Sequence, residues 1–309
     1  MAKQKVAFLG LGVMGYPMAG HLSRQGFDVT VYNRSAEKAQ RWCEEYAGNW
    51  ATTPAEAAAQ AEFVFCCVGQ DDDVRKVTTG AQGAFESLKK GAIFVDHTTA
   101  SAALAKELSG ISKAHGFHFI DAPVSGGQQG AENGRLTIMC GGDESIFQQL
   151  APVLECYAQT AKLLGPSGSG QLCKMVNQVC IAGLVQGLAE GLHFAQSAGL
   201  DVKQVVEVIS KGAAQSWQMD NRHKTMLADD YEHGFAVDWM RKDLNIVLQE
   251  ARANGAQLPV TALVDQFYAD VQAAGGGRWD TSSLLTRLGN TEAPASVETP
   301  KINSISAPD

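Results

Sequence analysis

A long proline-free segment sets the plan of this chain of 309 residues. Residues 171–199 consist mostly of good helix formers and follow a Gly/Ser-rich stretch at residues 165–170. This junction predicts one helix of roughly 40 Å, at a rise of about 1.5 Å per residue, which is longer than a small domain needs. Strand and helix patterns alternate before this segment, and only helical patterns follow it. We therefore expect an interdomain helix that joins an α/β domain to an all-helical domain.

The α/β domain opens with a strand, a glycine motif and a helix in direct succession. An apolar run at residues 5–9 leads into the motif, and a helical pattern follows it. In this context Gly10 permits a tight turn, Gly12 lets the backbone approach a pyrophosphate, and Gly15 lets the helix pack on the strand. The helix N-terminus then faces the phosphates. These features predict a Rossmann-type dinucleotide-binding domain over residues 1–164, with a cofactor loop made of Gly10, Leu11, Gly12, Val13, Met14 and Gly15.

The end of the second predicted strand, residues 28–32, bears on the choice of cofactor. An NAD site usually places an Asp or Glu there to bind the ribose 2′-hydroxyl. This strand is followed instead by Asn33, Arg34 and Ser35. Because a guanidinium can pair with a 2′-phosphate, we expect Asn33 and Arg34 to bind NADP(H) in preference to NAD(H). A solvated turn is the alternative interpretation.

Three further strands are predicted at residues 63–68, 92–96 and 117–121, with helical patterns between them. Ligands bind beyond the carboxyl ends of such parallel strands. The candidate contacts there are Val68, Gly69, Thr98 and Thr99. Residues 136–140 and 161–164 are expected to complete the same sheet.

The loop after the strand at 117–121 contains Ser125, Gly126 and Gly127. It offers a hydroxyl and several backbone N–H groups, which together make a suitable nest for a carboxylate. A plain turn after a strand is the alternative, and the residues alone favour neither.

Lys174 and Asn177 lie near the start of the long helix. They are three residues apart, so they share a face of that helix. A lysine beside an amide in an interdomain cleft would form a site for proton transfer. We therefore predict a catalytic role for both.

The second domain is predicted over residues 165–288. After the long helix, helical patterns recur at residues 201–211, 217–227, 239–254, 259–274 and 280–288. Residues 289–309 then turn to Pro, Ser, Thr, Ala and Asn with few large apolar side chains. We expect this last segment to be a disordered tail.

Bulk properties exclude several classes of protein. The net charge of −8, without a basic cluster, argues against a nucleic-acid partner. Seven cysteines without CxxC spacing predict a reduced, cytoplasmic protein, and no metal site is expected. The N-terminus enters a strand at once, so no signal peptide is expected. The most apolar stretch, residues 179–188, is too short to span a bilayer, so no membrane association is expected.

Four segments together resemble the β-hydroxyacid dehydrogenase family, the 3-hydroxyisobutyrate dehydrogenase-like enzymes. Residues 8–18 resemble the N-terminal signature of that family, and residues 121–127 resemble its substrate-binding motif. Residues 170–177 are similar to its catalytic motif, and residues 240–244 to its C-terminal cofactor motif. The four motifs occur in the family's order and cover the chain to about residue 288.

The resemblance implies an NAD(P)-dependent oxidoreductase that interconverts a small 3-hydroxy acid and its semialdehyde. It makes Lys174 the general acid/base, and Asn177 the group that orients the substrate. The loop of residues 125–127 would hold the substrate carboxylate. A homodimer or homotetramer, built through the helical domain, is also implied.

The resemblance also bears on individual positions near the cofactor. Thr99 and Lys242 match positions that contact cofactor and substrate, although the sequence alone favours a solvated lysine at 242. Two residues depart from the pattern. His21 stands where the family commonly has Asn, and Gly69 stands where it often has Pro.

Other functions are weighed against this one. A 6-phosphogluconate dehydrogenase shares the overall plan, but those chains are much longer and have a histidine before the catalytic asparagine. Imine reductases generally replace the lysine that is present here as Lys174. That lysine and Asn177 also argue against a non-catalytic dinucleotide sensor. The substrate stays open among 3-hydroxyisobutyrate, tartronate semialdehyde, succinic semialdehyde, glyoxylate and L-serine, with Trp217 and Trp239 as candidate side chains of the cleft.

Overall fold

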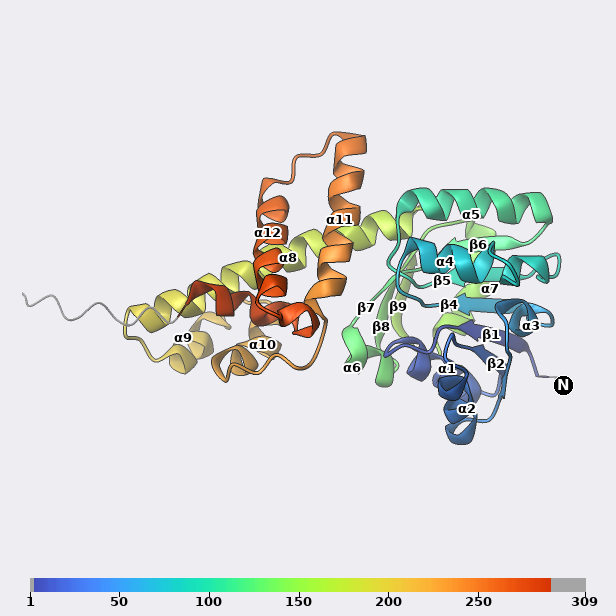
Figure 1. Ribbon diagram of the computed structural model, residues 1–309, viewed down its shortest axis with the longest axis horizontal. Coiled ribbons are helices and arrows are strands. Elements are labelled where there is room, and N and C mark those ends of the chain that lie inside the picture. Colours follow the sequence, from blue (N-terminus) through green and yellow to red (C-terminus); the bar gives the residue numbers. More distant parts are fainter. Residues whose placement is uncertain (1–2, 290–309) are drawn as a thin grey trace, which may run out of the picture.

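The computed structural model describes residues 3–289 and shows two domains joined by one long helix (Figure 1). All of the predicted tail except Gly289 therefore lies outside the described residues. The first domain alternates strands and helices. In chain order its elements are β1 (Lys5–Leu9), α1 (Gly15–Arg24), β2 (Asp28–Tyr32), α2 (Ala36–Glu45), β3 (Asn49–Trp50), α3 (Pro54–Ala58), β4 (Phe63–Cys66), α4 (Asp71–Thr78), η1 (Ala84–Glu86), β5 (Ile93–Asp96), α5 (Ala102–His115), β6 (His118–Asp121), β7 (Val124–Ser125), α6 (Gly127–Glu132), β8 (Leu136–Cys140), α7 (Glu144–Leu154) and β9 (Ala158–Leu163).

A six-stranded parallel sheet forms the centre of the first domain, in the order β3-β2-β1-β4-β5-β6. Its side chains alternate between two cores, as a sheet covered on both faces requires. Val6 and Phe8 of β1 enter a core with α1, α2 and α7, whereas Ala7 and Leu9 enter a core with α3, α4 and α5. The strand order reverses between β1 and β4, which is where sheets of this kind bind dinucleotides. The predicted Rossmann-type fold is confirmed.

The prediction that residues 136–140 and 161–164 complete this sheet is wrong. β8 and β9 form a separate three-stranded sheet with β7, in the order β7-β8-β9. β7 follows β6 after only Ala122 and Pro123, and it pairs antiparallel with β8. Because β7 takes the pairing edge of β8, the connection to β6 is reduced to an isolated bridge between Asp121 and Gly141.

The second domain is helical, as expected. Its elements are α8 (Ser169–Ser197), α9 (Val202–Ile209), α10 (Trp217–Leu227), α11 (Val237–Asn254), α12 (Pro259–Ala273), η2 (Gly276–Arg278) and η3 (Thr281–Leu288). The last predicted helix is a 3-10 helix rather than an α-helix. A separate core holds the domain together, in which Val185 and Leu192 of α8 pack with Met240 of α11 and Tyr268 of α12.

Helix α8 belongs to both domains. It has 29 residues and runs from the strands of the first domain to the far end of the second (Figure 1). At the junction, its Met175 packs with Ala102 of α5 and Val247 of α11 in a small apolar cluster. The domain boundary expected at residues 164–165 lies between β9 and α8. The sheet and the helical domain therefore share one rigid element.

By length and composition alone, α8 could cross a membrane, with a mean hydropathy of 1.3 in a window that is 44% buried. The most apolar stretch within it, residues 179–188, is too short to do so by itself. The helix also carries buried polar side chains, and it packs against α10, α11 and α12. Such packing is typical of the central helix of a protein core.

Replacing Gly15 by Ala tests the close contact between α1 and the glycine loop. A Cβ at position 15 would collide with the carbonyl oxygen of Gly10 and approach the ring of Phe8. We expect Gly15→Ala to lower the free energy of unfolding by about 1–3 kcal/mol. Gly187 of α8 is exposed and has open space around its Cα. The control Gly187→Ala should therefore raise the free energy of unfolding by about 1 kcal/mol. Urea denaturation measures both variants. If Gly15→Ala changed the free energy of unfolding as Gly187→Ala does, the close contact at Gly15 would not matter for stability.

Candidate active site

The glycine loop between β1 and α1 has the backbone geometry of a cofactor loop. Gly10 has a φ of 98°, and a side chain there would collide with the Cys67 carbonyl. Leu11 is fully buried in the core, so only its backbone can face a ligand. Gly12 is exposed, and the space where its Cβ would lie is open. Val13 is 62% exposed beside it.

This loop fits the pyrophosphate of a dinucleotide. Within residues 3–289, the N–H groups of Gly12, Val13 and Met14 form no hydrogen bond. Met14 is the N-cap of α1 and makes no side-chain cap. Unpaired amides at a helix N-terminus attract an anion, because they add to the positive end of the helix dipole. The structure thus leaves these donors available for phosphate oxygens.

Asn33 and Arg34 follow β2 and have different surroundings. The Asn33 Oδ1 accepts a hydrogen bond of 3.0 Å from Leu11 N–H, and its Nδ2 donates to Ser35 O at 3.1 Å. Asn33 therefore shapes the glycine loop in addition to any contact with a cofactor. Arg34 is exposed and forms no ion pair within the described chain. Its guanidinium is free to bind a ligand.

The loops after β4 and β5 are joined to each other and to α11. The Thr98 hydroxyl accepts a hydrogen bond of 3.0 Å from Val68 N–H. Lys242 of α11 donates from its Nζ to Thr99 O at 2.6 Å and to Gly69 O at 3.3 Å. The structure therefore brings together four of the predicted cofactor contacts, and Lys242 connects them to the second domain.

The same ammonium pairs with a buried carboxylate. Lys242 Nζ lies 2.8 Å from Asp243 Oδ1, and the carboxylate side chain is only 2% exposed. This contact is an ion pair without hydrogen-bond geometry, so Asp243 Oδ1 keeps an unfilled acceptor position within residues 3–289. Asp243 Oδ2 accepts a hydrogen bond of 2.6 Å from Gln178 Nε2 of α8. The polar network therefore runs from α11 back to α8, one helical turn from the predicted catalytic residue Lys174.

Asn177 is held by this network rather than by Lys174. Its Nδ2 donates to Gln178 Oε1 at 2.8 Å. Its own Oδ1 has no partner among residues 3–289, and Asn177 is partly buried. An amide oxygen held in this way can accept a hydrogen bond from a substrate hydroxyl.

Lys174 lies on the buried side of α8 and is 7% exposed. Its Nζ forms no hydrogen bond within residues 3–289. Burial lowers the pKa of Lys174 below its ordinary value; the Asp243 carboxylate opposes this shift, and the Lys242 ammonium adds to it. A lowered pKa makes a lysine a better proton acceptor–donor pair for general acid/base catalysis than an exposed lysine.

The start of α8 is fixed by two side chains that sequence reasoning did not single out. Asp121, at the end of β6, accepts hydrogen bonds from Gly168 N–H at 2.7 Å and Gln171 N–H at 3.0 Å. Burial raises the pKa of Asp121 to about 6, although these two amides act in the opposite direction. Gln171 is 1% exposed; it donates to Thr98 O at 2.7 Å and accepts from Ala100 N–H at 3.0 Å. These bonds set where Lys174 lies relative to the loop after β5.

The periodicity of α8 carries a signal for the missed glutamines. Gln171, Lys174 and Gln178 follow one another at steps of three and four on the buried stripe of an otherwise apolar helix. Polar side chains at core positions need partners, because an unpaired buried polar group costs free energy. The spacing could therefore have indicated a polar network, but not its members on other elements.

The predicted carboxylate loop lies on a different element from Lys174. Ser125 pairs with Thr137 in the small sheet, and Gly126 and Gly127 are exposed with φ values of 131° and 61°. Helix α6 follows and packs against α1, where His21 Nε2 lies 2.9 Å from Ala131 O. Within residues 3–289 no hydrogen bond joins this loop to Lys174 or Asn177. The structure thus ties the loop to the helix of the cofactor loop.

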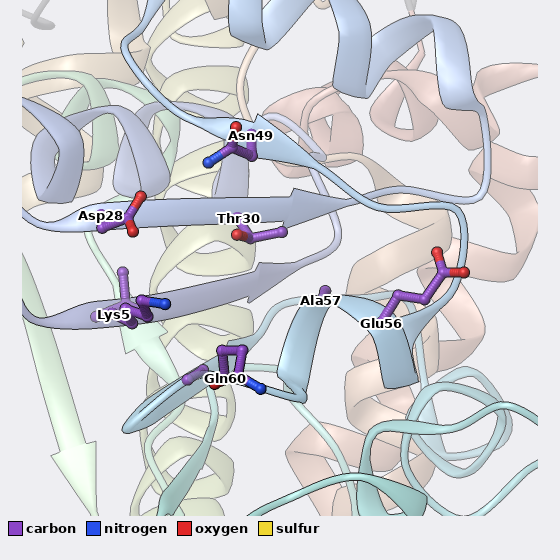
Figure 2. A pocket seen from close by; sticks show the side chains of 9 residues that line it. Lys5, Asp28, Thr30, Asn49, Glu56, Ala57 and Gln60 are labelled. Atoms are coloured by element: carbon purple, nitrogen blue, oxygen red, sulfur yellow. The ribbon is translucent and has the colours of Figure 1, made fainter.

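A pocket elsewhere in the first domain is separate from this site. Figure 2 shows its lining side chains from β1, β2, β3 and α3, among them Lys5, Asp28 and Glu56. Lys5 and Asp28 are the first residues of their strands. The pocket therefore opens toward the amino ends of the strands, and none of the predicted site residues lines it.

Comparisons with known proteins agree with this geometry. The NAD binding domain of 6-phosphogluconate dehydrogenase matches residues 5–165, and the NAD-binding domain of NADP-dependent 3-hydroxyisobutyrate dehydrogenase matches residues 168–288. An uncharacterized oxidoreductase of Shewanella frigidimarina is 63% identical over 92% of this chain and 98% of its own. A probable 3-hydroxyisobutyrate dehydrogenase-like 1, mitochondrial, of Arabidopsis thaliana is 42% identical over 92% of this chain and 85% of its own.

A solved structure shows the same architecture. The 3-hydroxyisobutyrate dehydrogenase of Mycobacterium tuberculosis, described with L-serine, superposes with a TM-score of 0.84 at 28% identity and covers 93% of this chain and 99% of its own. The fold and the matched domains define a two-domain NAD(P)-dependent oxidoreductase. The identities over nearly the whole chain narrow this further. The chain belongs to the β-hydroxyacid dehydrogenase family and is an NAD(P)-dependent hydroxyacid dehydrogenase.

Replacing Lys174 by Met tests its unusual protonation. Because the folded-state pKa is lowered, the unfolded chain binds more protons between the folded and unfolded pKa values, and stability rises with pH there. The penalty for burying the ammonium is thus fully present below the folded pKa and is lost as pH approaches the ordinary value of 10.5. We expect Lys174→Met to be more stable than the natural protein near neutral pH, with a difference that shrinks by about pH 10.

Urea denaturation at several pH values measures this difference. Lys162 on β9 is exposed, so the control Lys162→Met should give a difference that does not change with pH. A Lys174→Met protein that is less stable than the natural one at neutral pH would show instead that the ammonium is stabilised by Asp243.

Proposed function

We propose that the protein interconverts a small 3-hydroxy acid and its semialdehyde, with NADP(H) preferred over NAD(H). The observation that carries this proposal is the position of Lys174. It is buried where α8 leaves the first domain, its pKa is lowered, and it lies in the field of Lys242 and Asp243. General acid/base groups of this kind act on hydroxyl and carbonyl oxygens.

Each end of the reactants has a proposed partner in the chain. The amides of residues 12–14 hold the pyrophosphate, and Arg34 holds the 2′-phosphate. Bound NADPH supplies the hydride that reaches the carbonyl carbon. Lys174 donates a proton to the carbonyl oxygen in reduction and accepts the hydroxyl proton in oxidation. Asn177 orients the substrate, and residues 125–127 bind the carboxylate.

The charge of the site suits an acid. Lys174 and Lys242 share one carboxylate, that of Asp243. Whenever both lysines are protonated, these three groups together carry one net positive charge, which favours an anionic substrate near Lys174. The names of the relatives also support an acidic substrate, because they include 3-hydroxyisobutyrate dehydrogenases, one of them described with L-serine. The matched C-terminal domain is that of an NADP-dependent enzyme.

Loss of Lys174 should remove proton transfer but leave cofactor binding. We expect Lys174→Ala to lower kcat on the best semialdehyde by about 10²–10⁴-fold with little change in the dissociation constant of NADPH. Initial rates and fluorescence titration measure the two quantities, with the exposed Lys162→Ala as control. Parallel losses of rate and of NADPH affinity would assign Lys174 a structural role.

The cofactor preference rests on Arg34. We expect the natural protein to prefer NADPH and Arg34→Asp to reduce kcat/KM with NADPH by about 10–100-fold, with a much smaller effect for NADH. Arg41 on α2 is also exposed, so Arg41→Asp is a control with the same change of charge. A preference for NADH in the natural protein, or equal effects of the two substitutions, would overturn the assignment of Arg34.

A further inference from the structure

Trp239 joins Lys242 on the side of α11 that meets the first domain. The two residues are three apart and therefore share a face of the helix. Lys242 reaches the carbonyls of Gly69 and Thr99, as described above. The Trp239 ring centroid lies 6.0 Å from the Lys242 Nζ, at the outer range of a cation–π contact. The indole therefore extends beside the ammonium toward the loops after β4 and β5.

The indole lies directly against the backbone of Gly69. A Cβ built on Gly69 would be 3.4 Å from Trp239 Cη2 and 2.6 Å from Asp73 Oδ2. The indole and the Asp73 carboxylate thus both lie near the position that a side chain of residue 69 would occupy. Trp239 is nevertheless 40% exposed, so a large part of its ring surface is available to a ligand.

One group of the proposed substrate has no partner assigned so far. A 3-hydroxy acid has its reacting carbon at Lys174 and its carboxylate at residues 125–127, so the remaining variable group is the substituent on C2. An aromatic ring is a rigid apolar surface with few rotamers, and it can contact a small alkyl group but cannot yield to a longer one. Trp239 lies beside Lys242, and the Lys242 ammonium in turn acts on the charge of Lys174. The indole is therefore on the side of α11 from which we expect a substrate at Lys174 to be contacted.

We propose that Trp239 is a specificity-determining residue that limits the C2 substituent of the substrate to hydrogen or methyl. This inference rests on the proposed function, because it assumes that a 3-hydroxy acid reacts at Lys174. Gly69 is the main-chain neighbour of the indole: a Cβ there would make an ordinary van der Waals contact with Trp239 but would collide with the Asp73 carboxylate.

The test compares substrates that differ only at C2. We would measure kcat/KM with NADP⁺ for 3-hydroxypropionates carrying hydrogen, methyl, ethyl or propyl at C2, for the natural protein, Trp239→Phe and Trp239→Leu. One methylene in an apolar pocket is worth about 10–200-fold in kcat/KM. We expect the natural protein to prefer methyl over propyl by at least about 10-fold, and Trp239→Leu to reduce or invert this ratio by about 10–100-fold. Trp239→Phe should lie between the two.

Trp50 provides the matched control. It is 37% exposed, close to the exposure of Trp239, but it lies on the edge strand β3. Trp50→Leu should leave the methyl-to-propyl ratio unchanged. Melting temperatures and NADPH dissociation constants of all variants show whether each one is folded and binds cofactor.

The outcomes separate the two proposals. An unchanged ratio in a folded Trp239→Leu variant overturns the role of Trp239 and leaves the proposed function standing. A uniform loss on all four substrates together with weaker NADPH binding also overturns it, because the indole would then serve the cofactor or the docking of the domains. A natural protein that oxidises none of the four substrates, and reduces none of the matching semialdehydes, overturns both.

Discussion

The carboxylate of Asp121 fixes the geometry on which the site depends. It accepts the first amides of α8 at the end of β6, so it joins the edge of the sheet to the helix that carries Lys174. A helix start has unpaired N–H groups, and a carboxylate there satisfies them and complements the helix dipole. Gln171 adds a second attachment, to the loop after β5. Lys174 is therefore placed by bonds to the same strand ends that form the cofactor edge.

Electrostatics and packing act together around Lys174. A buried ammonium is unfavourable unless it is compensated, and here one carboxylate serves two lysines. Gln178 holds that carboxylate from α8, while the apolar cluster at Met175 and Val247 closes the junction nearby. The lowered pKa of Lys174 is thus a consequence of how α8 and α11 pack, and the network that orients Asn177 is part of the same packing.

The sequence allowed the local features to be predicted and left the nonlocal ones open. The glycine loop, five of the six strands of the main sheet and the long helix follow from short-range patterns, and these predictions agree with the structure; the two-residue edge strand β3 was not predicted. The placement of β8 and β9 depended on which strand edge lay free after Pro123, and no pattern within either strand encodes that. In the same way Gln178 finds Asp243 at a distance of 65 residues along the chain, so its partner could be learned only from the fold.

The two hydrogen bonds from Lys242 to the first domain affect which substitutions the protein can accept. Lys242 donates hydrogen bonds to the main-chain oxygens of Gly69 and Thr99. Every amino acid supplies such an oxygen, so a substitution at position 99 alters what a ligand meets without removing the acceptor that joins the domains. A side chain at position 69 would in addition have to displace the Asp73 carboxylate. Of the groups in this contact, only the Lys242 ammonium belongs to a side chain. The side chain at position 99 can therefore vary while the two domains stay joined.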